Sequence, residues 1–160
     1  MPRSTQPYLR MDKGFVYLVS LIDVYSRYIV DWRLSTTLET SFCVEALESA
    51  LGKGKPRIVN TVQGCQFTSE EWVSCLKEHE ILISMTGKGR CLDNVYIERF
   101  WRSLKREKFY LFEYASIKEL KKDITEYMDF YNNERPHQSL NHRIPATLYF
   151  NKAPSAAIGF

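Results

Sequence analysis

The sequence predicts a mixed α/β domain in which helices cover both faces of one sheet. Two β-rich apolar runs, residues 15–22 and 27–34, are joined by a short turn and are typical of a hairpin. After the hairpin, helical segments alternate with short strands, an order that indicates a sheet flanked by helices. No repeat or linker interrupts the 160 residues, so we expect residues 1–160 to form a single domain.

The N-terminal elements are predicted to be strands of unequal quality. Residues 1–10 are polar and contain two prolines, which makes them a poor, degenerate first strand. Residues 15–22 (FVYLVSLI) are almost wholly apolar and predict a strand buried on both faces. The turn at residues 23–26 leads into the partner strand at 27–34 (RYIVDWRL).

Capping boxes mark the start of three of the four predicted helices. In such a box a Ser or Thr side chain and a Glu three residues later satisfy free N–H groups of the first turn. The three boxes are Thr36 with Glu39, Thr68 with Glu71, and Ser116 with Glu119. The short strands expected between the helices are residues 57–62 and 81–85. The last helix is the most regular, and residues 133–160 are expected to follow it as an extended C-terminal tail.

The segment from Gly87 to Lys108 concentrates the positive charge of the chain. A Gly- and Lys-rich loop gives way at Asp93 or Asn94 to a helical pattern. From Thr86 to Tyr110 there are seven Lys and Arg against three Asp and Glu, whereas the whole chain has a net charge of +3. Such a loop and helix suit a polyanion, and a carboxylate such as Glu98 is a hard ligand for Mg²⁺. The alternative is a surface helix whose charges are only solvated.

Several classes of protein are disfavoured by composition. The four cysteines show no paired metal-binding spacing and indicate reduced thiols in a cytoplasmic protein, with zinc not expected. No apolar run reaches the roughly 20 residues of a membrane span, and the first residues lack the apolar core of a signal peptide. We therefore expect no membrane association, and no pattern indicates a small-molecule substrate.

Four blocks, taken together and in order, resemble the catalytic core of bacterial insertion-sequence transposases of the OrfB type. The blocks are GFVYLVSLIDVYSRYIVDW, NTVQGCQFTSEEW, GKGRCLDNVYIERFWRSLKREK and YNNERPHQSLNHRIPATLYF. These transposases belong to the retroviral-integrase-like DDE superfamily. The resemblance implies a ribonuclease H-like fold with a five-stranded mixed sheet flanked by helices. It also implies a DNA transferase in which two Asp and one Glu hold two Mg²⁺ or Mn²⁺ ions.

Carried over residue by residue, the resemblance leaves one acid of three. The Glu falls on Glu98 in DNVYIERF. The second Asp falls on Val62 in NTVQG, and the 35 residues between Val62 and Glu98 match the family spacing. Aligning Tyr8 with the Tyr of the family's first strand places Thr5 at the first Asp. Valine offers no lone pair, and a neutral hydroxyl is a weak substitute for a carboxylate.

The sequence therefore predicts a transposase core whose chemistry has degenerated, with Mg²⁺ or Mn²⁺ weakly bound or absent. Asp12, Asp23 and Asp93 are better explained as turn or cap residues than as replacement ligands. Binding to the DNA backbone is still expected. The predicted contacts are Lys88, Arg90, Arg99, Arg102, Lys105 and Arg106.

Two alternatives stay open at this point. The first is an active Mg²⁺-dependent strand transferase or nuclease with a rearranged metal site. The second is a non-catalytic partner that forms oligomers, including homo-oligomers, with an active transposase. The family signature Arg135-Pro136-His137 is predicted to form a rigid turn, with a DNA contact by Arg135 or His137 as the other interpretation.

Overall fold

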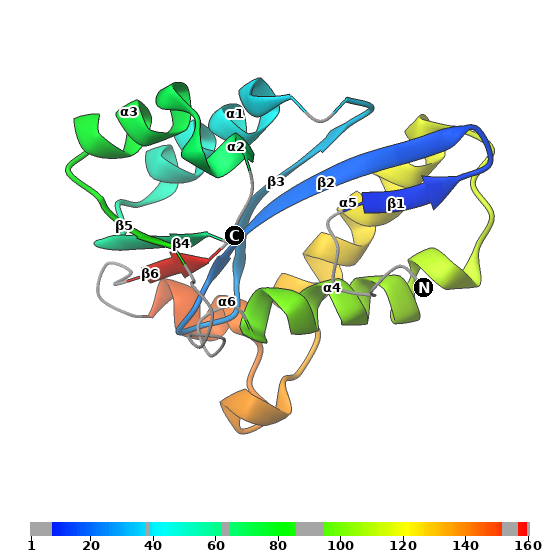
Figure 1. The fold of residues 1–160 in the computed structure, drawn as a ribbon. Helices are drawn as coiled ribbons and strands as arrows, with labels where there is room; N and C mark the ends of the chain where they lie inside the picture. Colours follow the sequence, from blue (N-terminus) through cyan, green and yellow to red (C-terminus); the bar gives the residue numbers. More distant parts are fainter. Residues whose placement is uncertain (1–7, 38, 62–64, 86–94, 152–156, 160) are drawn as a thin grey trace.

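The computed structural model describes residues 8–37, 39–61, 65–85, 95–151 and 157–159. In this part of the chain six strands form one mixed sheet with helices on both faces (Figure 1). The strands are β1 (Tyr8–Met11), β2 (Gly14–Asp23), β3 (Ile29–Ser35), β4 (Ile58–Thr61), β5 (Leu82–Met85) and β6 (Ala157–Gly159). The predicted α/β class is confirmed, although the sheet has one strand more than the five expected.

The β2–β3 hairpin is the longest pairing in the sheet. Its antiparallel register runs from Tyr17 opposite Ser35 to Ile22 opposite Ile29. Asp23 closes the turn: its buried carboxylate accepts hydrogen bonds from the backbone N–H of Ser26, at 2.9 Å, and from the Ser26 hydroxyl. The turn role predicted for Asp23 is therefore confirmed.

β1 and β6 lie end to end along one edge of β2. Both run antiparallel to β2, β1 beside residues 14–17 and β6 beside Ile22 and Asp23. β3 occupies the opposite edge, because Tyr17 pairs with both β1 and β3, and Ile22 pairs with both β3 and β6. β6 also runs parallel to β4, so the C-terminal strand joins the hairpin half of the sheet to the β4–β5 half.

This arrangement corrects the expectation for the two ends of the chain. The degenerate first strand expected over residues 1–10 is a strand at Tyr8–Met11, with residues 1–7 outside the described part. The tail at 133–160 is not extended. It contains the 3₁₀ turn η2 (Gln138–Leu140), helix α6 (Pro145–Phe150) and β6. Pro145 occupies the first turn of α6, a position that proline tolerates, so this proline begins a helix within the segment that was expected to be extended.

Helices cover the two faces of the sheet in separate groups (Figure 1). One group consists of α1 (Thr40–Lys53), α2 (Cys65–Thr68) and α3 (Glu70–Glu78), and its core includes Leu47, Val59 and Trp72. The other consists of α4 (Val95–Glu107) and α5 (Ile117–Asn133), followed respectively by η1 (Phe109–Leu111) and the tail. Its core includes Leu18, Phe100 and Ile124. Alternate residues of the buried strand β2 serve both cores, as expected for a strand covered on both sides.

Only one of the three predicted capping boxes forms, and in it the Glu side chain bonds to the residue before the cap instead of the cap itself. Ser116 Oγ accepts a hydrogen bond from Glu119 N at 3.2 Å, and Glu119 Oε2 accepts one from Ala115 N at 3.0 Å. At α3 the cap is Ser69, whose hydroxyl accepts from Trp72 N, rather than Thr68. At α1 the cap position is Glu39, with no side-chain hydrogen bond, so the Thr36 box is wrong. Thr68 is instead the last residue of a short helix, α2.

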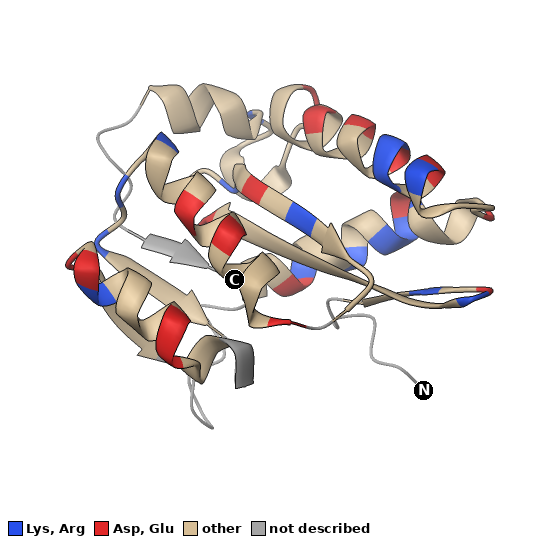
Figure 2. Ribbon diagram, turned by 90° about the horizontal axis from the view of Figure 1, so that it is seen from above, with Lys and Arg blue, Asp and Glu red and all other residues tan. Residues whose placement is uncertain are grey.

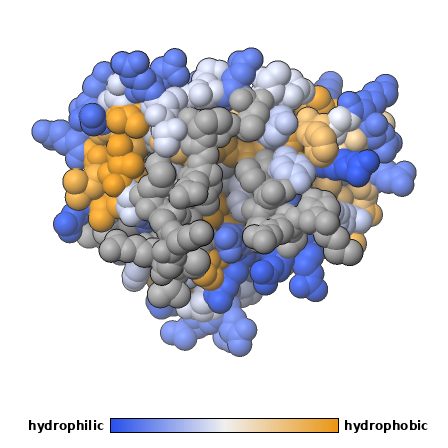
Figure 3. All heavy atoms as spheres, viewed as in Figure 1, coloured by the Kyte–Doolittle hydropathy of each residue, from blue (hydrophilic) through white to orange (hydrophobic). Residues whose placement is uncertain are grey.

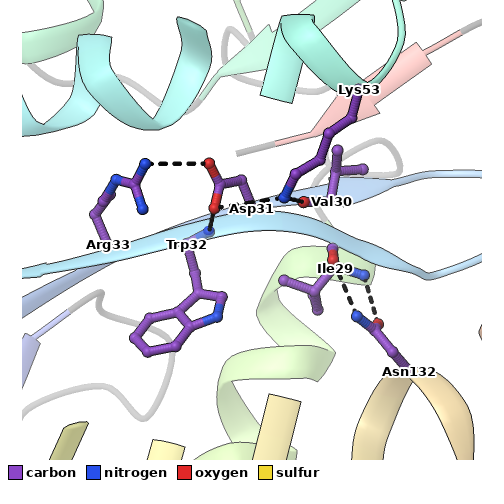
Figure 4. Close-up of polar contacts among 7 residues, drawn as sticks. All are labelled: Ile29, Val30, Asp31, Trp32, Arg33, Lys53 and Asn132. Atoms are coloured by element: carbon purple, nitrogen blue, oxygen red, sulfur yellow. Dashed lines mark hydrogen bonds and ion pairs between the residues drawn. The ribbon is translucent and has the colours of Figure 1, made fainter. Parts of the chain in front are cut away.

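A pair of hydrogen bonds ties the end of α5 to the start of β3 (Figure 4). The buried side chain of Asn132 accepts from Ile29 N at 2.8 Å and donates to Ile29 O at 3.0 Å. The backbone N–H and C=O of Ile29 are thus both bonded to one side chain that lies 103 positions away in the sequence.

Some apolar surface is left at the edge of the sheet. Leu82 and Ile83 of β5 are 62% and 37% exposed, and apolar atoms appear on the side of Figure 3 where Figure 1 places β5. In the described part of the chain β5 pairs only with β4. Among the helices that the structure describes, none is both long enough and apolar enough to cross a bilayer.

Candidate functional site

Helix α4 carries the acid and most of the described cations of the candidate site. Ile97, Phe100, Trp101 and Leu104 are buried against the sheet and fix the rotation of the helix. Their spacing leaves the opposite face to solvent. Glu98 therefore stands exposed in the first turn of α4.

The two positions predicted to have lost their acids lie outside the described residues. Thr5 precedes β1, and Val62 comes directly after Thr61, the last residue of β4. Asp93 also lies outside them. Two of the predicted DNA contacts, Lys88 and Arg90, also lie outside the described residues.

The acids that the structure describes do not gather around Glu98. No group of three or more His, Cys, Asp or Glu side chains that could hold a metal ion occurs among the described residues. Asp12 is exposed in the β1–β2 turn, as predicted, and the carboxylate of Asp23 is engaged by Ser26.

Asp31 is a buried carboxylate that sequence reasoning did not consider. Its oxygens lie 3.8 Å from Lys53 Nζ and 3.7 Å from Arg33 Nη2, and one of them accepts from Trp32 N (Figure 4). Two cations and a backbone N–H therefore surround this acid, which makes it a structural ion pair and not a free metal ligand. The exposed Glu98, with Val62 and Thr5 at the positions predicted for the two Asp, would not fit a two-ion site.

The exposed face of α4 is cationic. Arg99, Arg102 and Arg106 are exposed, and Figure 2 shows Lys and Arg recurring along the helices behind the sheet. Glu98 and Arg102 are one turn apart but form no ion pair with each other. The positive charge of Arg102 is therefore not neutralised by this acid. Lys105 differs from the other three because it is only 4% exposed and lies near the Tyr8 ring, with Nζ 5.8 Å from the centroid. Burial lowers the pKa of the Lys105 ammonium, and the side chain does not join the surface cations.

The Arg135-Pro136-His137 signature forms a turn that is held by backbone hydrogen bonds. His137 pairs with Arg143 in an isolated antiparallel bridge, and His142 N donates to His137 O at 2.8 Å. The His137 ring is buried edge-on against Tyr131, with 4.7 Å between the centroids. The predicted role as a rigid turn that returns the tail to the core is supported by these contacts.

A partly exposed ion pair links this turn to α4. Glu107 accepts hydrogen bonds from Arg135 Nη2 at 2.6 Å, from Arg135 Nε at 3.0 Å and from Tyr127 Oη at 2.9 Å. Burial alone would raise the pKa of the Glu107 carboxyl, but these hydrogen bonds outweigh it and hold the pKa below its ordinary value. Sequence reasoning missed the pair because Glu107 and Arg135 are 28 residues apart, and no local pattern links them.

Solved structures with the same architecture define the class of this fold. The catalytic core domain of HTLV-2 integrase, in a structure in complex with magnesium, superposes with a TM-score of 0.69 at 14% identity, over 91% of this chain and 90% of that one. A chain from the structure of a simian T-cell lymphotropic virus intasome in complex with PP2A regulatory subunit B56 gamma superposes with a TM-score of 0.75 at 13% identity, over 91% and 52% of the two chains. The fold is thus that of a retroviral integrase catalytic core, which is ribonuclease H-like.

The family follows from sequence. Two family models described as integrase core domain match residues 5–91 and 79–145. The chain is 34% identical over 142 residues to the transposase of insertion sequence element IS904 from Lactococcus lactis, covering 86% of this chain and 56% of that protein. It is 36% identical over 134 residues to the transposase InsF of IS3A from Escherichia coli, covering 81% and 46%. The chain belongs to the integrase core domain family of insertion-sequence transposases, and it spans about half the length of these relatives.

Proposed function

We propose that this chain is a transposase core that binds the nucleic-acid backbone but has lost strand-transfer chemistry. The observation that carries the proposal is that Glu98 is exposed and no metal-binding group of acids occurs among the described residues, with Thr5 and Val62 at the positions predicted for the other two acids. A single carboxylate does not hold Mg²⁺ against its hydration shell, so the ion that the family uses is weakly held or missing here.

Binding to DNA is supported by the charge on α4. Arg99, Arg102 and Arg106 are exposed along one helix, and Lys88 and Arg90 precede it in the sequence. Guanidinium groups pair with phosphate oxygens through two parallel hydrogen bonds and release counterions. Contacts of this kind position a protein on DNA without reading bases.

A salt titration of duplex DNA binding tests this function. We expect measurable filter binding at low salt, with log K falling linearly with log salt concentration. Replacement of Arg106 by Gln should reduce the slope by about 1. Absence of affinity at low salt would reject the proposal.

Loss of chemistry is tested separately with a nicking assay in Mg²⁺ and in Mn²⁺. We expect no nicking by the unaltered chain. Metal-dependent nicking that disappears in Glu98→Gln would contradict the proposed loss and favour an active enzyme with a rearranged site.

A second candidate function is association with another integrase core. The exposed Leu82 and Ile83 favour it, because they lie on β5, which is an edge strand in the described part of the chain. Unpaired edges and apolar patches are common sites of association. Sedimentation velocity checks this, and a profile that is unchanged by an active transposase core and by concentration would count against it. Either function is expected in the cytoplasm.

A further inference from the structure

A hollow opens where α4, the end of α5 and the Arg135-Pro136-His137 turn meet. Its volume is about 710 Å³, which is large enough for a phosphate group together with its flanking sugars. Its basic lining comes from Arg99, Arg102, Arg135, His137 and His142. None of the described residues that line it is acidic.

The cations of the hollow differ in how much of their charge is already neutralised. Arg99 and Arg102 are exposed and make no hydrogen bond or ion pair with any residue in the described part of the chain. Arg135 shares its charge with Glu107, which holds the guanidinium in place. Arg27 adds a further charge close by, with its guanidinium carbon 3.5 Å from the centroid of the Tyr96 ring. The hollow therefore has a surplus of positive charge, with one guanidinium, that of Arg135, held in place by Glu107.

A buried polar atom in the lining lacks a partner. His137 is 8% exposed, its ring bonds to the backbone of Tyr131, and Nε2 has no hydrogen-bond partner among the described residues. Because the other ring nitrogen donates to the Tyr131 backbone in the neutral imidazole, Nε2 is an acceptor and offers no hydrogen bond to an anion. The case for an anion in the hollow therefore rests on the arginines. The groups that face this imidazole are Arg135, Arg27, Glu107 and Tyr131.

The wall that carries His137 and His142 is rigid before any ligand arrives. His137 N donates to Arg143 O at 3.1 Å, and His142 N donates to His137 O at 2.8 Å. Asn141 and His142 both adopt left-handed backbone conformations that close the turn. A preorganised wall loses little conformational freedom on binding, which favours recognition of a small charged group.

We infer that this hollow is a seat for one phosphate group of a nucleic-acid backbone, held between Arg99 and Arg102 on α4 and Arg135 and His142 on the turn. The inference rests on the proposed DNA-binding function and extends it from the face of α4 to a defined pocket beside it. A backbone phosphate is favoured over a free anion because two of the arginines belong to the same exposed helix face that would follow the DNA.

The three histidines of the chain allow a direct test by NMR. His137 and His142 line the hollow, whereas His79 ends α3 on the other face of the sheet and serves as the internal control. A short DNA duplex, in buffer free of phosphate, should shift the ring signals of His137 and His142 and leave that of His79 in place. The Arg99→Gln, Arg102→Gln double variant should remove these shifts and reduce the salt slope of DNA binding by about 2.

Arg106→Gln is the matched variant, because Arg106 is an exposed cation of the same helix outside the hollow. It should weaken DNA binding but keep the histidine shifts. DNA binding with unmoved His137 and His142 signals would overturn the seat and leave the proposed function intact. Shifts caused by inorganic phosphate but not by DNA would overturn the nucleic-acid assignment. Absence of DNA binding in filter assays would remove both proposals together.

Discussion

Arg135 donates hydrogen bonds to both carboxylate oxygens of Glu107, at 2.6 and 3.0 Å. The pair connects the last turn of α4 to the turn that follows α5, and Tyr127 adds a third hydrogen bond from within α5. The position of the cationic hollow therefore depends on an ion pair whose acid is itself outside the hollow's lining.

Glu107→Gln should lower the free energy of unfolding by about 1–2 kcal/mol, because an amide cannot accept from Arg135 at both positions, and partial exposure keeps the loss small. Urea denaturation at neutral pH measures it, with the exposed Glu113→Gln as the control. The folded-state pKa of Glu107 is depressed below its ordinary value of 4.5. The pair's contribution is therefore complete above that pH and is lost as the pH falls below it. Equal pH profiles in both variants would contradict this.

Protonation of His137 should destabilise the fold. Burial, Arg135 and Arg27 lower the pKa of its imidazole from 6.5 to about 4. Because the folded-state pKa is depressed, the neutral ring's contribution is present above about pH 6.5 and is lost as the pH falls towards 4. The loss should reach about 2–3 kcal/mol near pH 4.

Unfolding free energies at pH 7 and pH 5 measure this effect. His137→Gln, which does not titrate, should remove the part of the pH slope that lies above pH 5. His142→Asn is the control, since His142 is exposed and Asn tolerates its left-handed backbone. A slope that persists in His137→Gln would assign the titration to another group.

Asn132→Ala should cost about 3 kcal/mol, because it leaves the N–H and the carbonyl of the buried Ile29 without their side-chain partner. Asn133→Ala is the matched control. Asn133 is the next residue and is exposed, and its side chain bonds only to Asp129 within the same helix. Equal changes in unfolding free energy in the two variants, measured by urea denaturation, would show that the two hydrogen bonds to Ile29 contribute nothing to stability.

The parts of the fold that sequence could predict are those with local signals. The apolar run at 15–22, the stripe of α5 and the Ser116 box each lie within a few turns of chain, and each was predicted correctly. The role of Asp23 followed from turn chemistry. The Thr36 box failed because the same residue types also occur in ordinary turns, where tertiary contacts decide the helix start.

The features that sequence could not predict depend on contacts between distant segments. Nothing near residue 158 indicates a strand that pairs with residue 23 on one side and residue 59 on the other. Lys105 was predicted as a surface cation from its neighbours, but the helix rotation set by Phe100 and Leu104 buries it. The charge of α4 could be predicted, whereas the hollow beside it required the turn after α5 to be placed.

Ile158→Pro tests whether β6 is an integral strand of the sheet. Ile158 pairs with Asp23 of β2 and Val59 of β4, and a proline between two neighbours removes a donor and clashes with the ladder. We expect a loss of about 3 kcal/mol or more in unfolding free energy. Ile158→Thr keeps the N–H and should cost much less. Equal stability of Ile158→Pro and the unaltered chain would show that β6 contributes nothing to the fold.

Restoring the acids tests the proposed loss of chemistry most directly. Val62→Asp alone should not restore Mn²⁺-dependent nicking, because the introduced carboxylate and Glu98 would form a two-carboxylate site in which a second ion has no bridging ligand. The double variant Thr5→Asp, Val62→Asp should bind Mn²⁺, and Glu98→Gln in that background should abolish binding. The unaltered chain is the reference and should show no heat of binding. If the single Val62→Asp variant binds Mn²⁺ and nicks DNA, the first acid is supplied by a residue other than position 5, and the alignment through Tyr8 is wrong. If the unaltered chain binds two ions, Glu98 has partners outside the described residues and the chain is an enzyme.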